Sequence, residues 1–279
     1  MLKFYGYIGL LLVIFAEINF YTRIEPFATW YIPIVWFGYI LFVDSLVFRI
    51  RKKSLISNYQ KEFAFMALVS MFFWSIFEFY NIFTQSWTYS NYVWYVHIVD
   101  FTTIMPAVLE TFMLISALGL FRSLDKKAQP IKSNKNKERY TTIVKLLVIF
   151  GAFIAILPLI TPNIGINFVW FGLFLFLDPL NYLTGRPSVL QMASKGRKSI
   201  IARLFLAGIT MGFFWEFWNS QAYPKWIYNL PALLPSFHLF AMPVFGYIGY
   251  LPFALETYLF YTFARSFVFD KGNELLEIT

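Results

Sequence analysis

The chain has 279 residues, of which 59% are hydrophobic and 14% are charged, and its net charge is +8. A soluble domain of this length could not bury so large an apolar fraction, so the composition excludes a protein surrounded entirely by water. The absence of cysteine excludes disulfides, thiolate nucleophiles and cysteine-ligated clusters, and two histidines are too few for a histidine-rich metal site. We expect no cofactor and no metal site, although carboxylates could hold a divalent cation.

Apolar runs long enough to cross roughly 30 Å of hydrocarbon recur along the whole chain. They predict an all-α fold, a polytopic membrane helical bundle. Eight transmembrane helices are predicted, over residues 4–20, 31–49, 63–84, 103–122, 142–160, 166–184, 200–218 and 243–264. The first of them resembles a secretory signal, but no small-residue cleavage site follows Phe20, so we expect it to remain as an anchor.

The basic residues concentrate in alternate connections between the predicted spans. These connections hold Arg49, Arg51, Lys52, Lys53 and Lys61, then Arg122 through Arg139, then Arg186, Lys195, Arg197, Lys198 and Arg203, whereas Arg23 and Lys225 fall in the others. This asymmetry is the positive-inside bias, and it predicts a multi-pass protein of the cytoplasmic membrane with both termini in the cytoplasm. The expected partner is membrane lipid and not nucleic acid, because the positive charge follows topology and forms no soluble basic face.

Three strings recur in the same order in the two halves of the chain. The sequence VWFG occurs at 35–38 and at 169–172, and each copy stands at the same distance before an aspartate. The other pairs are FEFYN at 77–81 with WEFWN at 215–219, the tripeptides WTY at 87–89 and WIY at 226–228, and PAVLET at 106–111 with PFALET at 252–257. Such self-similarity predicts an internal duplication.

The duplication divides the chain into two four-helix membrane repeats, residues 1–122 and 141–279, joined by a basic cytoplasmic linker over 123–140. Four crossings return the chain to its starting side, so the two repeats are expected to be parallel. The last ten residues, 270–279, are expected to form a short cytoplasmic tail.

Six carboxylates fall at matched places inside the predicted spans, namely Asp44, Glu78, Glu110, Asp178, Glu216 and Glu256. A carboxylate in a span costs on the order of 2.5–3.5 kcal/mol, so intramembrane acids often mark functional sites. We interpret the four glutamates as catalytic residues of a water-poor pocket that hold and deliver a proton, with aromatic faces stabilising a developing cation. The alternative is that they hydrogen-bond neighbouring side chains only to hold helices together.

The candidate substrate-binding residues lie next to these glutamates or in the segments that follow them. Asn81 and Asn219 each stand three residues after a glutamate, on the same helical face. The others are Trp87, Tyr89, His97, Trp226, Tyr228 and His238, in segments expected to be outer loops or partly immersed helices. A histidine at such a place could equally contact only the membrane interface.

Asp44 and Asp178 are interpreted as structural acids. Both stand near cytoplasmic helix ends, where ion pairs with Arg49, Arg51 or Arg186 are expected. Asp178 is followed by Pro179, a pattern typical of a helix cap and its first turn.

Several of these strings resemble the integral membrane lycopene cyclases. The resemblance rests on Trp215-Glu216, Trp226-Ile227-Tyr228, Gly246, Gly249 and residues 252–260, with a thinner copy in Glu78, 87–89, Pro106 and Glu110. It implies a duplicated membrane enzyme of carotenoid biosynthesis that cyclises or isomerises a membrane-dissolved isoprenoid by acid catalysis. Glu216 and Glu256, with Glu78 and Glu110, would then donate protons and stabilise cations.

The sequence departs from that family in two respects. A single glutamate followed by Thr257 stands where the family has paired acids after a proline, and each repeat has four predicted spans where the family repeat has three. Two other functions stay open. The same acids suit a proton- or cation-coupled transporter, and they suit a lipid-binding or scaffold protein without catalytic activity.

Overall fold

The computed structural model describes residues 1–125, 134–165, 168–229 and 237–269, and it is mostly helical. The first half contains α1 (Phe4–Thr22), α2 (Tyr31–Arg51), α3 (Leu55–Asn58), α4 (Gln60–Thr84), β1 (Trp87–Ser90), α5 (Trp94–Phe101), α6 (Ile104–Ala117) and η1 (Arg122–Leu124). The second half contains α7 (Asn134–Ile160), α8 (Pro162–Gly165), α9 (Val169–Leu183), α10 (Val189–Ser194), α11 (Lys198–Gln221), β2 (Lys225–Tyr228), β3 (His238–Leu239), β4 (Met242–Pro243), η3 (Val244–Gly249) and α12 (Tyr250–Arg265).

Within the described residues, six helical segments are long and apolar enough to cross a membrane, which indicates a membrane protein. They are Phe4–Thr22, Tyr31–Arg51, Gln60–Thr84, Trp94–Ala117, Glu138–Ile160 and Lys198–Gln221. At 1.5 Å per residue, helices of this length match the hydrocarbon thickness. The other two predicted spans coincide with α9 and α12, which have 15 and 16 residues and are shorter than these six.

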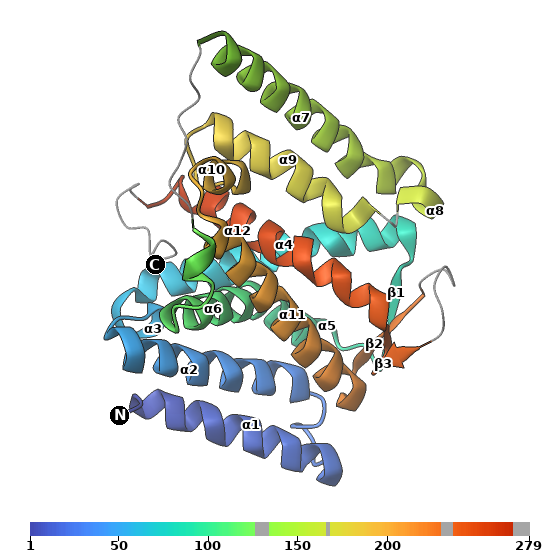
Figure 1. Cartoon of the computed structure of the whole chain (residues 1–279). Coiled ribbons are helices and arrows are strands. Elements are labelled where there is room, and N and C mark those ends of the chain that lie inside the picture. The colour runs from blue at the N-terminus through green and yellow to red at the C-terminus, as the bar shows by residue number, and fades with distance from the viewer. Residues whose placement is uncertain (126–133, 166–167, 230–236, 270–279) are drawn as a thin grey trace.

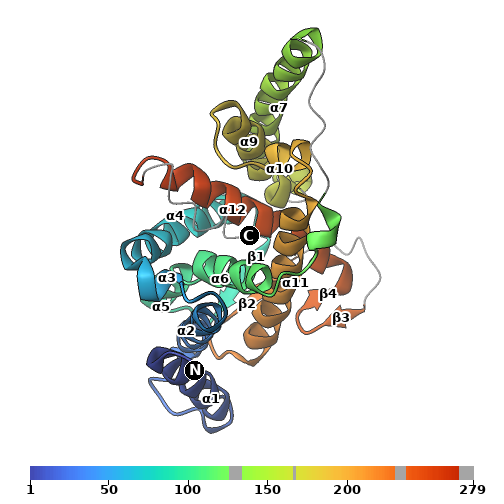
Figure 2. The same cartoon turned by 60° about the vertical axis from the view of Figure 1, so that its left-hand side comes forward.

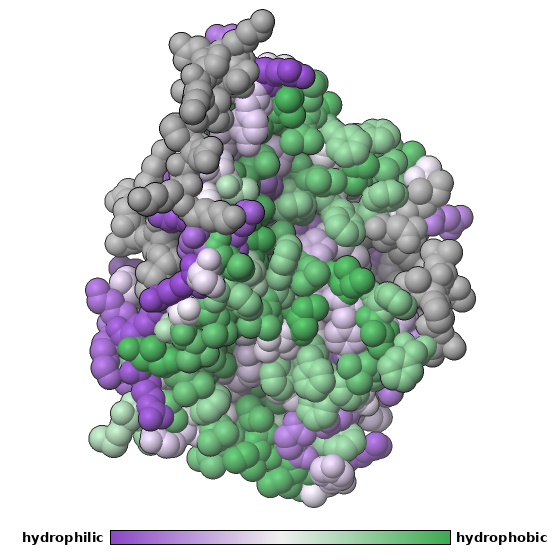
Figure 3. Space-filling view, in the orientation of Figure 1, coloured by the Kyte–Doolittle hydropathy of each residue, from purple (hydrophilic) through white to green (hydrophobic). Residues whose placement is uncertain are grey.

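The long helices run between two ends of the molecule. Figure 1 shows the start of α1, α3, η1 and α10 toward one end, which we call the basic end, and β1, β2 and α8 toward the other, which we call the ribbon end. In the space-filling view, hydrophobic residues cover much of the visible face between the two ends, and hydrophilic residues gather along the basic end (Figure 3). This distribution suits a body surrounded by lipid with its polar ends in water.

Two helix pairs form opposite edges of the molecule around a central group of α4, α6, α11 and α12. Helix α1 packs along α2, and α7 packs along α9 (Figures 1 and 2). The glycine of each VWFG string lies at one of these contacts. A Cβ atom on Gly38 would lie 2.8 Å from the carbonyl oxygen of Gly9, and one on Gly172 would lie 2.7 Å from the Cα of Ala155. Glycine at these positions therefore permits close approach of the paired helix backbones.

The Trp-x-Tyr strings after Glu78 and Glu216 form strands where outer loops or partly immersed helices were predicted, whereas His97 lies in a helix, α5. Strand β1 pairs antiparallel with β2, so that Trp87 is opposite Tyr228 and Tyr89 is opposite Trp226. Side chains of a strand alternate between its two faces. The Trp-x-Tyr pattern of each strand therefore places all four rings on one face of this two-stranded ribbon.

Helix α7 begins inside the predicted linker, at Asn134. The apolar pattern alone placed the start of this helix at residue 142, but the preceding residues include lysine, glutamate and arginine, which are favourable in helices. The rest of the linker (126–133), the start of the predicted sixth span (166–167) and the predicted tail (270–279) lie outside the described residues.

Candidate functional site

Glu78 lies on α4, where three ring donors converge on one carboxylate oxygen. Its Oε1 accepts hydrogen bonds from Trp74 Nε1 (2.9 Å), Trp87 Nε1 (3.2 Å) and the Tyr89 hydroxyl (2.5 Å). Trp74 precedes Glu78 by four residues on the same helix face, and the other two donors come from β1. The ribbon thus covers the glutamate with its Trp-x-Tyr face.

Glu216 occupies the corresponding position on α11 and is fully buried. Its Oε1 accepts hydrogen bonds from the hydroxyls of Tyr228 (2.6 Å) and Tyr250 (2.7 Å), and Trp226 Nε1 donates to the Tyr228 hydroxyl (2.9 Å). Its Oε2 is buried with no hydrogen-bond partner among the described residues. Glu216 is therefore oriented through one oxygen while the other stays unengaged.

The tyrosines of the ribbon remain hydrogen-bond donors over a wide pH range. Burial and the charge of the neighbouring glutamate raise the pKa of Tyr89 and of Tyr228 well above the ordinary value of 10.0. A neutral phenol donates its proton to an acceptor, whereas a phenolate beside a carboxylate would repel it. Both hydroxyls therefore stabilise their glutamates at neutral pH.

Asn81 and Asn219 hold the ribbon to the helices. Asn81 donates to the carbonyl oxygen of Trp87 (2.9 Å) and accepts from its N–H (3.1 Å). Asn219 makes the same two hydrogen bonds with the backbone of Trp226, both at 3.0 Å. We expected these amides to contact a substrate, but their donor and acceptor groups are engaged by strand backbone.

Glu110 on α6 and Glu256 on α12 are fully buried, each toward a different helix. Glu256 Oε1 accepts from the backbone N–H of Phe174 on α9 (3.1 Å), and its Oε2 has no hydrogen-bond partner among the described residues. Neither carboxylate oxygen of Glu110 has such a partner in the described part of the chain, and Asp44 on α2 is the charged group that interacts with it electrostatically. Glu110 therefore faces α2 and Glu256 faces α9, which are the corresponding helices of the two halves.

An aromatic cluster fills the space between Glu78 and Glu216. Its members are Trp36, Trp74, Phe77, Trp87, Trp170, Trp215, Trp226 and Phe253. The centroid of Trp74, which donates to Glu78, lies 5.2 Å from that of Trp215, the residue before Glu216. The cluster therefore joins the surroundings of these two glutamates, whereas no described contact joins Glu110 to Glu256.

The two histidines have different environments. His97 on α5 is buried against Tyr89, with ring centroids 4.5 Å apart, and its Nε2 has no hydrogen-bond partner among the described residues. His238 is exposed in β3, where it pairs with Pro243 of β4. His97 therefore adjoins the Glu78 site through Tyr89.

The predicted ion pair of Asp44 with a basic residue is wrong. Asp44 is fully buried and accepts hydrogen bonds from the hydroxyls of Tyr5 (2.5 Å) and Ser54 (2.8 Å) and from the N–H of Ile56 (2.9 Å). No ion pair of Asp44 occurs among the described residues. The chain turns back at α3, and Ser54 and Ile56 bring neutral donors to this carboxylate.

Asp178 does not begin a helix, although a helix cap was predicted there. Helix α9 continues through Asp178 and Pro179 to Leu183. The carboxylate accepts hydrogen bonds from the N–H groups of Val189 (2.5 Å) and Leu190 (3.2 Å), at the start of α10. Asp178 therefore satisfies free N–H groups of the next helix, and the predicted ion pair with Arg186 does not occur among the described residues.

A buried ion pair at the basic end was not predicted. Arg265, in the last turn of α12, donates through Nε and Nη2 to the two carboxylate oxygens of Glu62, at the start of α4, and the Tyr261 hydroxyl also donates to Glu62 (2.9 Å). In the sequence Glu62 follows Lys61 and is typical of a solvated helix end. Only the packing of α12 against α4 shows that it is buried.

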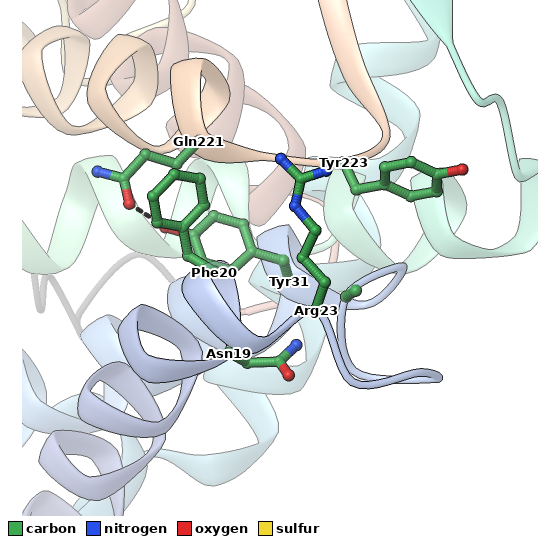
Figure 4. A pocket seen from close by; sticks show the side chains of 7 residues that line it. Asn19, Phe20, Arg23, Tyr31, Gln221 and Tyr223 are labelled. Carbon is green, nitrogen blue, oxygen red and sulfur yellow. Dashed lines mark hydrogen bonds between the residues drawn. The ribbon is translucent and has the colours of Figure 1, made fainter.

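A pocket opens at the ribbon end, away from the predicted site residues. It is a small hollow that is partly open to solvent, and it is lined by Asn19, Phe20, Arg23, Ala28, Tyr31, Gln221 and Tyr223 (Figure 4). The sequence singled out Arg23 only as a positive charge outside the basic connections. None of the four candidate glutamates lines this pocket.

The site thus combines carboxyl groups with unengaged oxygens, ring donors that orient them and a cluster of aromatic faces, which together could transfer a proton and stabilise a cation. No known protein family, no curated protein and no solved structure matches this chain.

Proposed function

We propose that this protein is an integral membrane enzyme that cyclises or isomerises a membrane-dissolved isoprenoid lipid by acid catalysis. The observation that carries the proposal is the Glu216 carboxyl group, which is fully buried beside the aromatic cluster with Oε2 unengaged. An ionised carboxylate in such a place is strongly disfavoured unless it is paired. No cation pairs with Glu216 among the described residues, so the neutral acid, the form that can donate a proton, is favoured.

The reaction needs no oxidant and no second substrate. The Glu216 O–H bond breaks as the alkene electron pair forms a new C–H bond, leaving a carbocation. The faces of Trp215, Trp226 and Phe253 attract that cation, each by about 0.5–2 kcal/mol. After ring closure or a shift of the double bond, a neighbouring C–H bond breaks and returns its proton to the carboxylate. The hydroxyls of Tyr228 and Tyr250 orient Oε1 and stabilise the carboxylate between the two steps.

We also propose that the chain crosses the membrane eight times, in two parallel repeats of four helices each. The paired arrangement of α1 with α2 and of α7 with α9 supports it, as do the matched hydrogen bonds of Asn81 and Asn219. Helix α9 and the joined η3–α12 would supply the two shorter crossings. The positive-inside bias then assigns the basic end and both termini to the cytoplasm. The resemblance of residues 252–260 to lycopene cyclases supports the isoprenoid substrate.

The test compares two glutamates that each accept a hydrogen bond from a tryptophan or tyrosine. Glu216→Gln keeps the shape of the side chain but removes the transferable proton, and Glu17→Gln does the same on α1, where Glu17 accepts from Trp218 Nε1 (2.9 Å). Membrane lipids of a host expressing each variant are compared by mass spectrometry with those of a host expressing the wild type. We expect Glu216→Gln to restore the profile of the empty host and Glu17→Gln to leave the wild-type profile.

Two results would contradict the enzyme. One is a host lipid profile that the wild-type protein does not change, and the other is equal activity of the Glu216→Gln variant at equal expression. A proton-coupled transporter is the second candidate, because Glu110 and Glu256 face different helices and do not converge on the aromatic cluster. Proton uptake by proteoliposomes that depends on Glu110 and Glu256, without any change in lipids, would favour the transporter.

A further inference from the structure

Glu110 lies in the middle of α6, and no donor reaches its carboxyl group. Its side chain is fully buried, and its two carboxylate oxygens have neither a hydrogen-bond partner in the described part of the chain nor more than a trace of accessible surface. No cation pairs with it among the described residues. An ionised carboxylate in such a place is strongly disfavoured, so the protonated acid is the favoured form of Glu110.

Asp44 on α2 acts electrostatically on Glu110, and its own surroundings are the opposite. Its carboxylate accepts hydrogen bonds from the hydroxyls of Tyr5 (2.5 Å) and Ser54 (2.8 Å) and from the N–H of Ile56 (2.9 Å). Donors of this kind stabilise an ionised carboxylate. Two neighbouring acids in a dry interior do not both ionise, so the stable state has one proton, on Glu110, and a carboxylate at Asp44.

Hydroxyl groups lead from Asp44 toward water. Because Tyr5 donates its proton to Asp44, the Ser57 hydroxyl, 2.8 Å from the Tyr5 oxygen, is the donor of the second hydrogen bond in the row. Ser57 is half-buried in α3, at the basic end of the molecule, where Lys52 and Lys53 before it are exposed (Figure 1). Such a row can pass a proton inward, since each hydroxyl oxygen accepts one proton as it gives up its own.

The matching acids of the second half are satisfied differently. Asp178 accepts from the backbone N–H groups of Val189 and Leu190, and Glu256 accepts from the N–H of Phe174. A backbone N–H donates a hydrogen bond but, unlike a hydroxyl, has no oxygen that accepts a proton in turn. The row of hydroxyls is therefore a feature of Asp44 and not of the position that the two halves share.

The other titratable groups around the pair contact residues elsewhere. Tyr39 on α2 lies beside Glu110, but its hydroxyl is 2.8 Å from that of Thr111. The charged and titratable groups of the other packed helices are engaged with groups away from the pair, namely Lys3 (the ring of Phe48), Glu62 (Arg265), Glu78 (Trp74), Arg203 (Leu120), Glu216 (Tyr228), Tyr258 (Phe112) and Glu256 (Phe174). The proton content of the pair therefore depends on Glu110 and Asp44 themselves.

We infer that Glu110 and Asp44 share one exchangeable proton, and that Tyr5 and Ser57 connect this pair to water at the basic end. In the exchange, the proton of Glu110 moves to Asp44, leaves through Tyr5 and Ser57, and is replaced by a proton from water along the same path, so the charge of the pair is unchanged. The oxygens of Glu110 have too little accessible surface for a larger ion, so the ligand is the proton itself. The inference does not depend on the proposed catalytic activity of Glu216.

Infrared spectroscopy of the purified full-length protein tests the shared proton, because a protonated carboxylic acid has a C=O stretching band that a carboxylate lacks. We expect Glu110→Gln to lose such a band at neutral pH. Asp44→Asn is expected to shift it, since the group beside the acid changes from a carboxylate to an amide. Glu17→Gln is the control, because Glu17 is half-buried, accepts from Trp218 and should leave the band unchanged.

Deuterium exchange tests the path. Transfer of the protein into heavy water shifts the band as the acid takes up a deuteron, and the rate of this shift measures the exchange. Tyr5→Phe removes one hydroxyl from the row and is expected to slow the shift about tenfold. Tyr7→Phe, at a residue of α1 that is 49% exposed, should exchange as the wild type does.

A carboxylic acid band that neither Glu110→Gln nor Asp44→Asn changes would overturn the shared proton. Equal exchange rates of Tyr5→Phe and Tyr7→Phe would overturn the path. The melting temperature of each variant shows whether it is folded, and Asp44→Asn identifies the band if Glu110→Gln is not. Host lipid profiles test Glu216 whereas these spectra test Glu110, so the two proposals can fail separately.

Discussion

Trp87 and Tyr228 stand opposite each other in the β1–β2 ribbon, and each donates a hydrogen bond to a different glutamate. Trp87 donates to Glu78 on α4, and Tyr228 donates to Glu216 on α11. A single pair of strands therefore fixes the donors of both carboxyl groups. Any change that separates the two strands should therefore disturb the hydrogen bonds of Glu78 and of Glu216 together.

Replacing Asn219 with leucine should destabilise the protein by about 1–3 kcal/mol, because the buried N–H and carbonyl groups of Trp226 would both lose their partner. Asn229→Leu is the matched control at the same end, since Asn229 is exposed and its side chain makes one hydrogen bond to the described residues, to the carbonyl oxygen of Gln85. Thermal unfolding in detergent, followed by tryptophan fluorescence, measures the difference. Equal melting temperatures for the two variants would contradict the role given to Asn219.

Gly38→Ala should loosen the pairing of α1 with α2. The added methyl group would lie 2.8 Å from the backbone oxygen of Gly9, which cannot move without separating the helices. Overpacking of this kind costs about 1–3 kcal/mol. Gly249→Ala is the control, because its nearest neighbour would be Trp170 at 3.9 Å. We expect a lower melting temperature for Gly38→Ala alone, and a similar loss in both variants would argue against a close contact at Gly38.

The tyrosines of the β1–β2 ribbon should make stability depend on alkaline pH. Because the folded-state pKa of Tyr228 is well above its unfolded value of 10.0, its contribution is fully present below pH 10.0 and is lost as the pH rises toward the folded pKa. We therefore expect the melting temperature to fall above pH 10, and Tyr228→Phe to reduce this fall. Tyr92→Phe, at a residue that is 59% exposed, should not change it. Absorbance at 295 nm during the titration would reveal early ionisation of Tyr228, which would contradict the prediction.

Glu62→Gln should destabilise the protein by about 3–5 kcal/mol, because buried Arg265 would lose the carboxylate that accepts from its guanidinium. The double variant Glu62→Gln, Arg265→Gln removes both charges and should recover much of that loss. Chemical or thermal unfolding of the wild type, of the single variants Glu62→Gln and Arg265→Gln, and of the double variant measures the effect as a double-mutant comparison. If the double variant were as unstable as the sum of both single changes, the two residues would not be coupled.

The amino-acid sequence by itself determined that the chain is helical and suited to a membrane. Backbone groups in lipid must be satisfied within their own segment, so apolar runs of this length predict helices whatever their neighbours are. The sequence also identified buried carboxyl groups at Glu110, Glu216 and Glu256, because acids within such runs have no route to water. These conclusions depend on local composition and spacing alone.

Only the tertiary structure decided which side chains meet. Four features join segments that lie apart in the sequence, and hydrophobic periodicity describes each segment only by itself. They are the pairing of β1 with β2, the neutral donors around Asp44, the ion pair of Glu62 with Arg265 and the pocket around Arg23. A carboxylate can be satisfied by an arginine, a hydroxyl, an indole or a backbone N–H with similar geometry, so its position in a helix does not select its partner. The partner is decided by how the helices pack and by which residues each connecting loop brings next to the carboxylate.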